Sequence, residues 1–264
     1  MRFDILTIFP QLLDSPLQEG IIRRALQAGK ISVNIHDIRD FAEDKHAMTD
    51  DRPFGGGEGM VMKPEPIVGT LRHVGELQPE GRVILLSPQG ETYSQETAKR
   101  LSAAEHLVLL CGRYEGVDER VRANYIDEEI SIGDYILTGG ELAAMVLIDS
   151  ITRLLPGVLG CDDSADNDTF SRGLLKNPQF TRPRVFEGKP VPDVLLSGDH
   201  EAIAEWRFIA SVQQTLERRP ELLNSVEFSD KELKILKKNS LLAAVKEIKN
   251  RQCQDPVENK YVSD

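Results

Sequence analysis

Three glycine-bearing loops are the parts of this sequence best suited to bind a small molecule. Each follows an apolar run, and they cover residues 85–90, 110–116 and 131–140. Glycine lets a ligand approach the N–H and C=O groups of such loops closely, and groups of this kind suit the edge of an adenine and a ribose. Ligands of open α/β sheets bind at the carboxyl ends of the strands. We therefore expect the three loops to converge on one small-molecule site.

Two common nucleotide-binding motifs are absent from the sequence. It contains neither G-x-G-x-x-G after a predicted strand nor G-x-x-x-x-G-K-[ST], so dinucleotide-binding and P-loop folds lose their usual support. The glycines of any single loop could instead serve only to form a tight turn. Three such loops in succession favour a binding site.

Strand and helix patterns alternate through residues 1–160. Strands are predicted at 3–9, 31–38, 83–86, 106–110 and 126–132, and helices at 21–28, 94–102, 117–125 and 141–155. Such alternation predicts an α/β domain with a mostly parallel sheet and helices on both faces. Residues 41–63 have no period and include the glycine-rich stretch 55–59. A long loop of this kind is usually functional when it is ordered, and the alternative is disorder.

The remainder of the chain predicts a second, helical domain. Residues 161–173 are rich in Asp, Ser and Asn and are typical of an interdomain linker. Apolar residues at spacings of three and four predict helices over 200–218 and 231–248. We therefore expect a small helical domain over 174–264.

Charge and cysteine usage limit the classes of function. The net charge of −11 comes from 32 Lys+Arg against 43 Asp+Glu and argues against broad nucleic-acid affinity. Residues 171–264 hold 16 Lys+Arg and 14 Asp+Glu, a net of +2, which leaves −13 for residues 1–170. A nucleic-acid partner would need local basic patches, chiefly in the second part. The three scattered cysteines fit a reducing cytoplasm better than disulfides or a zinc site, and no apolar run is long enough to span a membrane.

Several motifs in this chain resemble those of the bacterial tRNA (guanine-N1)-methyltransferase family, of TrmD type in the SPOUT superfamily. They are LCGRYEGVDER at 110–120, SIGDYILTGGE at 131–141, DDRPFGGG at 50–57, LLPGVLG at 154–160, QFTRP at 179–183, VLLSGDH at 194–200 and RRPELL at 218–223. The resemblance keeps this order over about residues 1–225. Glu58 stands where the family more often has proline, which leaves the shape of that loop open.

The resemblance implies a homodimer that binds S-adenosylmethionine in a deep trefoil knot. The expected reaction is methylation of N1 of guanosine 37, just 3′ of the anticodon of tRNA. The expected cofactor contacts are Leu86, Ser87, Pro88, Gln89, Gly112, Tyr114, Gly116, Ile132, Gly133, Asp134, Tyr135, Ile136, Leu137, Gly139 and Gly140. Most would act through backbone atoms.

The chemistry of guanine N1 requires a base and a cation. N1 carries a proton, so a general base must remove it, and the charge that spreads to O6 needs a cationic donor. By resemblance, Asp168 is the candidate base and Arg153 the candidate donor. By composition alone, Asp168 belongs to a solvated acidic linker and Arg153 is a helix C-terminal cation.

Further residues are assigned to the RNA by the same resemblance. Glu115 is expected to act with tRNA and Mg²⁺, which Glu115 and Asp168 could ligate with oxygen atoms; the alternative is a surface salt bridge from Glu115 to Arg113 or Arg120. The expected guanine-binding residues are Asp50, Arg52, Gly55, Gly56, Gly57 and Gly59. The planar fork of arginine also suits phosphate. On this ground of residue type, the candidates for contacts with tRNA phosphates are Arg182, Arg184, Arg207, Arg218 and Arg219. The alternative for each is an ordinary surface arginine.

Two other functions are compatible with parts of this pattern. The chain could be an RNA-binding module that kept the fold without the catalysis, because fold does not fix function. The glycine loops could also belong to a nucleotide hydrolase. The presence of Asp168 and Arg153 disfavours the first, and the missing P-loop lysine disfavours the second.

Overall fold

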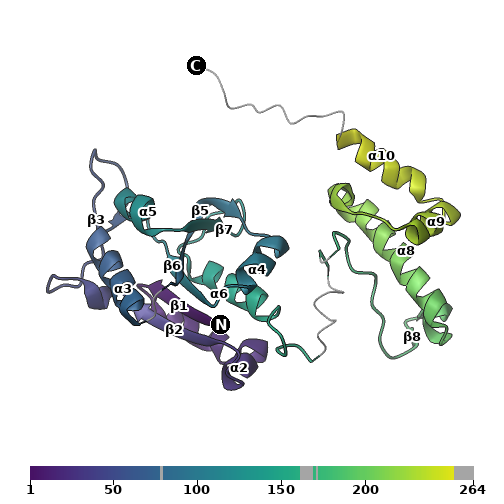
Figure 1. Cartoon of the computed structure of the whole chain (residues 1–264), viewed down its shortest axis with the longest axis horizontal. Coiled ribbons are helices and arrows are strands. Elements are labelled where there is room, and N and C mark those ends of the chain that lie inside the picture. Colours follow the sequence, from purple (N-terminus) through teal and green to yellow (C-terminus); the bar gives the residue numbers. More distant parts are fainter. Residues whose placement is uncertain (78–79, 161–168, 171, 253–264) are drawn as a thin grey trace, which may run out of the picture. The chain divides into compact units, whose positions relative to one another are not determined.

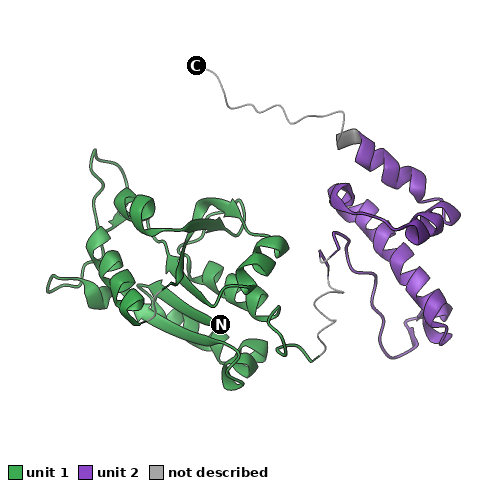
Figure 2. Cartoon of the chain, in the orientation of Figure 1, with its two compact units in different colours: residues 1–162 green, residues 163–264 purple. Residues whose placement is uncertain are grey.

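The protein, described by a computed structural model, divides into two compact units. They are Met1–Asp162 and Asp163–Asp264 (Figure 2). The structure describes residues 1–77, 80–160, 169–170 and 172–252, so most of the predicted linker 161–173 lies outside the described residues. Within those described ranges, no helix is long and apolar enough to cross a membrane.

A five-stranded parallel sheet forms the centre of the first unit. Its strands are β1 (Arg2–Thr7), β2 (Ser32–Asp37), β5 (Arg82–Thr92), β6 (His106–Cys111) and β7 (Glu128–Ser131), in the order β2-β1-β6-β5-β7 (Figure 1). Every pairing is parallel. The predicted parallel α/β sheet is therefore confirmed. All six residues of β6 are buried, as expected for a strand covered on both faces.

Helices cover both faces of this sheet. One face packs against α2 (Gly20–Gln27), α4 (Gln95–Ser102) and α6 (Glu141–Thr152), with the short η1 (Pro10–Leu13) and α1 (Asp14–Leu17) beside them. The other face packs against α3 (Pro64–Leu77), α5 (Glu119–Tyr125) and η2 (Ile38–Phe41). Two apolar cores result, one on each side of the strands, and together they fix the positions of the strand ends.

The stretch 41–63 and the region after it contain structure that periodicity does not predict. A two-stranded antiparallel ladder, β3 (Asp50–Asp51) with β4 (Val61–Met62), closes the glycine-rich loop at its base. Helix α3 follows although Pro64 and Pro66 open its sequence. Proline is tolerated in a first helical turn because the N–H groups there have no intrahelical acceptor.

The second unit has its own core and is largely helical. Its elements are β8 (Val185–Phe186), β9 (Lys189–Pro190), η3 (Asp193–Leu196), α8 (His200–Arg218), η4 (Pro220–Ser225), α9 (Asp230–Lys238) and α10 (Leu242–Gln252). Leu174, Val212, Leu223, Leu236 and Val245 are buried together in it.

The prediction of one helix over 231–248 is wrong, because α9 and α10 are separate helices. The chain turns at Ser240, whose φ of 59° is left-handed. Leu241 then donates its N–H to the C=O of Leu236 at 2.9 Å. Neither glycine nor proline marks this turn in the sequence, so the apolar spacing runs across it without interruption.

Asp4 of β1 is a fully buried carboxylate surrounded by donors. The Nε2 atoms of His36 and His106 lie 2.6 and 2.7 Å from its two oxygens, and the Arg2 guanidinium donates to both oxygens at 2.5 and 3.0 Å. Asn34 donates at 3.2 Å. Burial opposes ionisation, but the hydrogen bonds from His36, Arg2 and His106 outweigh it and hold the pKa of the Asp4 carboxyl well below its usual value. This cluster joins the three neighbouring strands β1, β2 and β6.

Replacement of Asp4 by asparagine should lower the free energy of unfolding by about 3 kcal/mol at neutral pH, because the buried charge partner of Arg2 is lost. A carboxyl with a depressed pKa stabilises the fold above its unfolded pKa near 4, and that contribution is lost as the pH falls. The advantage of the wild type over Asp4→Asn should therefore shrink by about 1 kcal/mol between pH 5 and pH 3. Urea unfolding at both pH values measures it. A pH-independent advantage would contradict the assignment.

Candidate functional site

The three glycine-bearing loops line one cavity of about 390 Å³ at the carboxyl ends of three adjacent strands. β6, β5 and β7 are neighbours in the sheet. The first loop leaves β5 between Leu86 and Glu91, where the register with β7 shifts, and the other two follow β6 and β7. The cavity therefore exists because sheet order places these three strand ends side by side.

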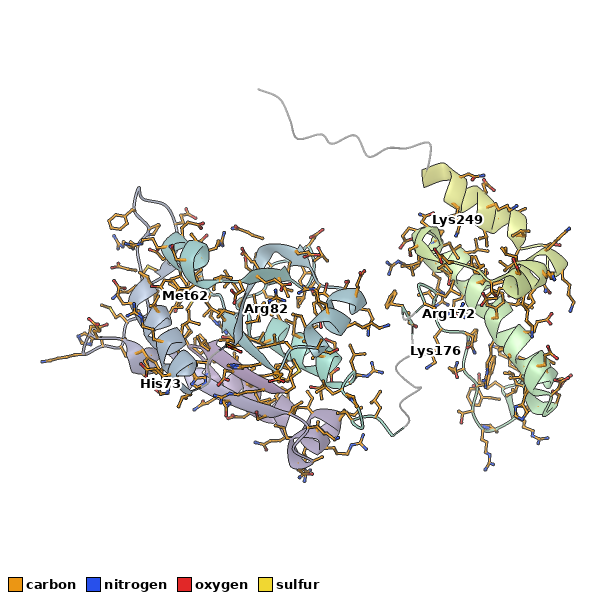
Figure 3. All side chains as sticks on the ribbon, viewed as in Figure 1. Met62, His73, Arg82, Arg172, Lys176 and Lys249 are labelled. Atoms are coloured by element: carbon orange, nitrogen blue, oxygen red, sulfur yellow. The ribbon has the colours of Figure 1, made fainter. Side chains whose placement is uncertain are left out.

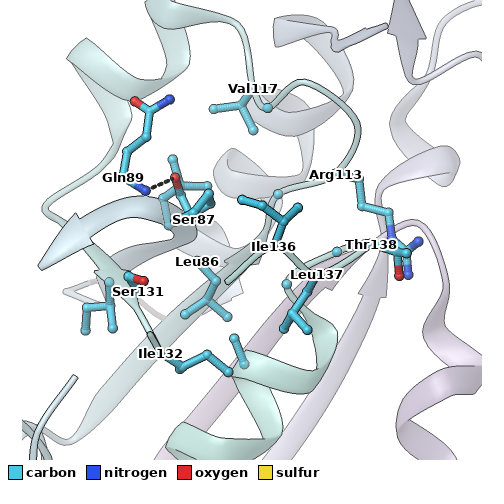
Figure 4. A pocket seen from close by; sticks show the side chains of 18 of the residues that line it. Leu86, Ser87, Gln89, Arg113, Val117, Ser131, Ile132, Ile136, Leu137 and Thr138 are labelled. Carbon is cyan, nitrogen blue, oxygen red and sulfur yellow. Dashed lines mark hydrogen bonds between the residues drawn. The ribbon is translucent and has the colours of Figure 1, made fainter. Parts of the chain in front are cut away.

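Nearly all the residues predicted to contact the cofactor line this cavity. They are Leu86, Ser87, Pro88, Gln89, Gly112, Tyr114, Gly116, Ile132, Gly133, Tyr135, Ile136, Leu137, Gly139 and Gly140. Figure 4 shows the apolar side chains of Leu86, Ile132, Ile136 and Leu137 around it. Asp134 is exposed and is not part of the lining.

The backbones of the loops approach one another too closely for larger residues. A Cβ atom added to Gly140 would lie 2.8 Å from Cα of Cys111, and one added to Gly90 would lie 2.4 Å from the backbone of Glu129. Gly140 also donates its N–H to the C=O of Gly112 at 3.0 Å. At these two positions glycine is required because the backbone passes close to a neighbouring strand, β7 at Gly90 and the end of β6 at Gly140.

A buried ion pair locks the second loop to the third. Arg113 donates from Nε and Nη2 to the two oxygens of Glu141, each at 3.0 Å, and only 2% of Glu141 is exposed. Thr7, the last residue of β1, donates to the same carboxylate at 2.7 Å. A Cβ atom on Gly139 would lie 2.4 Å from Arg113 Nε. The guanidinium carbon also lies 4.2 Å from the ring centre of Phe9, within range of a cation–π contact.

Sequence reasoning missed several residues that line the cavity. Arg113 is one, although it stands inside the LCGRYEG motif, and it lies beside Thr138 at the cavity wall (Figure 4). Arg122 of α5 is another, and it donates to the side-chain oxygen of Gln89 at 2.5 Å. The charge of an arginine in a glycine loop was the available signal, but only the structure shows which carboxylate it meets.

Glu115 lies where the glycine-rich loop closed by β3 and β4 contacts the second of the three glycine-bearing loops, residues 110–116. Its N–H donates to the C=O of Met60 at 2.9 Å, and Met62 donates to the C=O of Gly116 at 2.9 Å. A Cβ atom added to Gly59, whose φ is +80°, would lie 2.4 Å from Glu115 Oε1. The alternative that Glu115 serves as a salt-bridge partner of Arg113 or Arg120 is wrong, because these arginines pair with Glu141 and Asp118 in the described residues.

The structure does not bring the other predicted catalytic residues to this cavity within one unit. Arg153 caps the carboxyl end of α6, whereas Gly140 at the amino end of the same helix lines the cavity. Twelve helical residues span about 18 Å. Asp168 lies outside the described residues. Arg182 belongs to the second unit, and Asp50, Arg52 and Gly55–Gly57 lie on the loop closed by β3 and β4.

The described lining of the cavity carries few charged groups, namely Arg113, Glu115 and Arg122. Among the described residues that line the cavity, Glu115 is the only one with a carboxylate. Burial raises the pKa of the Cys111 thiol well above its usual value, and the negative charge of the nearby Glu141 raises it further. This cysteine therefore stays protonated and unreactive. Among the residues that the structure describes, no group of three or more His, Cys, Asp or Glu side chains could hold a metal ion.

Replacement of Arg113 by leucine should lower the free energy of unfolding by about 3 kcal/mol, because Glu141 would remain buried without its partner. The double variant Arg113→Leu, Glu141→Leu should be less destabilised than Arg113→Leu alone. Arg120→Leu is the matched control: Arg120 also binds one carboxylate through two nitrogens, but 70% of its side chain is exposed, so its loss should destabilise the protein far less than the loss of Arg113. Chemical denaturation compares the three. Equal effects at Arg113 and Arg120 would show that the buried pair has no special role.

Comparison with known proteins connects this site to one family. Residues 1–225 match the family described as tRNA (Guanine-1)-methyltransferase TrmD. A protein of Citrifermentans bemidjiense named tRNA (guanine-N(1)-)-methyltransferase is 53% identical over 235 residues, 89% of this chain and 94% of that protein.

Proteins of the same name from other bacteria are equally similar. The one from Geotalea uraniireducens is 54% identical over 229 residues, 87% of this chain and 93% of its own length. The one from Geobacillus kaustophilus is 53% identical over 237 residues, 90% and 97% of the two chains. By the extent of these matches, the chain belongs to the tRNA (guanine-N1)-methyltransferase family.

Proposed function

We propose that this protein methylates N1 of the guanosine just 3′ of the anticodon in tRNA, with S-adenosylmethionine as methyl donor, in the cytoplasm. The observation that carries the proposal is the single cavity built by the three motif loops of the family. S-adenosylmethionine, when bound, supplies a methyl group on a positively charged sulfur.

The cavity is suited to this donor in shape and in charge. Leu86, Ile132, Ile136 and Leu137 provide apolar walls, and the glycines leave backbone N–H and C=O groups accessible to the polar edges of an adenosine. Glu115, which lines the cavity, would supply a negative charge that suits a positively charged donor. The knotted topology that the family resemblance implies is part of the same proposal.

The chain's own residues would move the proton and stabilise the charge of the guanine. Asp168 accepts the N1 proton as the methyl group is transferred. Arg153 donates to O6, where negative charge develops. Asp50, Arg52 and the glycines of residues 55–59 form the wall that holds the base, next to Glu115. Glu115, Asp168 and RNA phosphates would supply oxygen ligands for Mg²⁺, which proteins commonly bind through one or two carboxylates together with phosphates.

We further propose that each active site is built from two copies of the chain. Arg153 lies about 18 Å along α6 from the cavity of its own unit, so a second copy would supply it. An apolar strip on the first unit fits such a partner. Leu142 and Val146, four residues apart on α6, are 62% and 43% exposed, and Leu12 on the neighbouring η1 is 54% exposed.

The reaction is tested by incubating the protein with a tRNA transcript and isotopically labelled S-adenosylmethionine. Mass spectrometry of the digested anticodon loop should show one labelled methyl group, on the guanosine 3′ of the anticodon. Substitution of that guanosine by adenosine should abolish labelling. Binding of tRNA without any methyl transfer would show instead an RNA-binding protein without catalysis, and a label on another base would refute the assigned position.

The two-chain site predicts complementation between inactive subunits. Gly112→Val fills the cavity wall, where an added Cβ already lies 3.1 Å from the C=O of Leu86, and should abolish cofactor binding. Arg153→Gln should slow transfer at least about 100-fold, because the donor to O6 is lost, while S-adenosylmethionine still binds. The two variants are mixed in equal amounts and allowed to exchange subunits. Half of the dimers then contain one subunit of each kind, and each of these has one intact site out of two. The mixture should therefore regain about a quarter of wild-type activity.

The control mixture combines Gly112→Val with Gly140→Val. Each variant subunit then has a damaged cofactor cavity of its own. A dimer of the two therefore has no intact cavity, and exchange of subunits restores no site. Recovery in the control, or its absence in the first mixture, would refute a site shared between chains.

A further inference from the structure

A second cavity, within the second unit alone, has the chemistry of an anion-binding site. Its volume is about 370 Å³, at the lower end of the range of about 300–1,000 Å³ that small-molecule sites occupy. It is formed by the segment 177–184 against η3 and α8. We call it the arginine pocket; its lining is Asn177, Pro178, Gln179, Phe180, Thr181, Arg182, Arg184, Val191, Leu195, Leu196 and Arg207.

The charge of the arginine pocket is positive and uncompensated. Arg182, Arg184 and Arg207 line it, and its lining contains no Asp or Glu from residues 1–77, 80–160, 169–170 or 172–252. In the part of the chain that the structure describes, none of the three forms an ion pair with a carboxylate. Arg172 and Lys249 of the same unit, labelled in Figure 3, differ from them: Arg172 pairs with Glu232 at 2.8 Å, and Lys249 donates to the C=O of Val226 at 2.5 Å.

The pocket also offers an aromatic surface. Phe180 is 48% exposed, and its ring lies 6.2 Å from that of Trp206 at an angle of 57°. Trp206 therefore supports one side of Phe180 while the ring stays accessible. An exposed aromatic ring beside guanidinium groups is the usual platform for an unpaired base, which stacks on the ring while its phosphate binds the arginines.

We propose that the arginine pocket binds one unpaired nucleotide of the tRNA, with its phosphate on Arg182, Arg184 and Arg207 and its base on Phe180. This inference rests on the proposed function for the class of nucleic acid. An acidic segment of a second copy would satisfy the arginines but would leave the Phe180 ring without a planar partner. Arginine is suited to phosphate because its planar fork donates two parallel hydrogen bonds.

The test measures binding of the full-length protein to an unmodified tRNA transcript at several salt concentrations. Arg182→Gln, Arg184→Gln and Arg207→Gln should each weaken binding several-fold and reduce the slope of log K against log salt by about 0.7–0.9, the value for one lost phosphate contact. Phe180→Leu should weaken binding about tenfold and leave the slope unchanged, because stacking releases no counterions.

Lys238→Gln is the matched control. Lys238 belongs to the same unit, and its change removes the same charge, but its ammonium group pairs with Glu205 at 2.8 Å outside the pocket. This variant should bind tRNA with the wild-type slope. All the variants should keep wild-type affinity for S-adenosylmethionine in calorimetry and the wild-type sedimentation coefficient.

Each other outcome overturns the inference in a recognisable way. If the wild type methylates tRNA but the pocket variants behave like Lys238→Gln, the arginine pocket is not an RNA site and the proposed function stands. If the arginine variants lose tRNA binding but Phe180→Leu does not, a phosphate binds there without a stacked base. If the variants shift the protein from dimer to monomer, the pocket is an interface between copies. If the wild type neither binds nor methylates tRNA, both proposals fail.

Discussion

The buried pair between Arg113 and Glu141 is the interaction on which the geometry of the first cavity depends. The pair connects the loop after β6 to the start of α6, and Thr7 ties both to the end of β1. Negative charge on Glu141 is also favoured at the first residue of a helix. Three segments that are distant in sequence are therefore held to one carboxylate. A cavity lined mainly by backbone groups needs such fixation, since backbone groups can recognise a ligand only if the loops that carry them stay in place.

Under the proposed function, the residues assigned to the reaction are distributed over more than one unit. The first unit contains the cavity and the glycine-rich loop, whereas Arg153 lies at the far end of α6 and the arginine pocket belongs to the second unit. An RNA loop is larger than either cavity, and a base must leave its stack before N1 becomes accessible. Separate surfaces for the base, the charge on O6 and the backbone phosphates are consistent with a substrate of that size.

Sequence reasoning was most successful where local signals and tertiary packing agree. Apolar runs at 106–110 and 126–132 predict β6 and β7 because buried parallel strands leave a direct trace in the sequence. Prediction from the sequence failed at α3, because the two prolines in its first turn argue against a helix. It also failed at Ser240, where a residue with a left-handed backbone separates two helices without glycine or proline. The loops that line the cavity were recognised from motifs. The pairing of Arg113 with Glu141 was not, because 28 residues separate these side chains and only the fold shows that they meet.

The contact between Gly59 and Glu115 connects the two halves of the proposed reaction site. A Cβ atom on Gly59 would lie 2.4 Å from the carboxylate of Glu115, which is the flexible end of that side chain. The firmer connection is between the backbones, because Glu115 donates to Met60 and Met62 donates to Gly116. Through these hydrogen bonds, a displacement of the loop that carries Glu115 would disturb the loop that carries Gly59. Thermodynamic linkage then makes the influence mutual: occupancy of either half changes affinity at the other by the same factor. Under the proposed function, the hydrogen bonds between these two loops are where the binding of the methyl donor and of the guanine would be coupled.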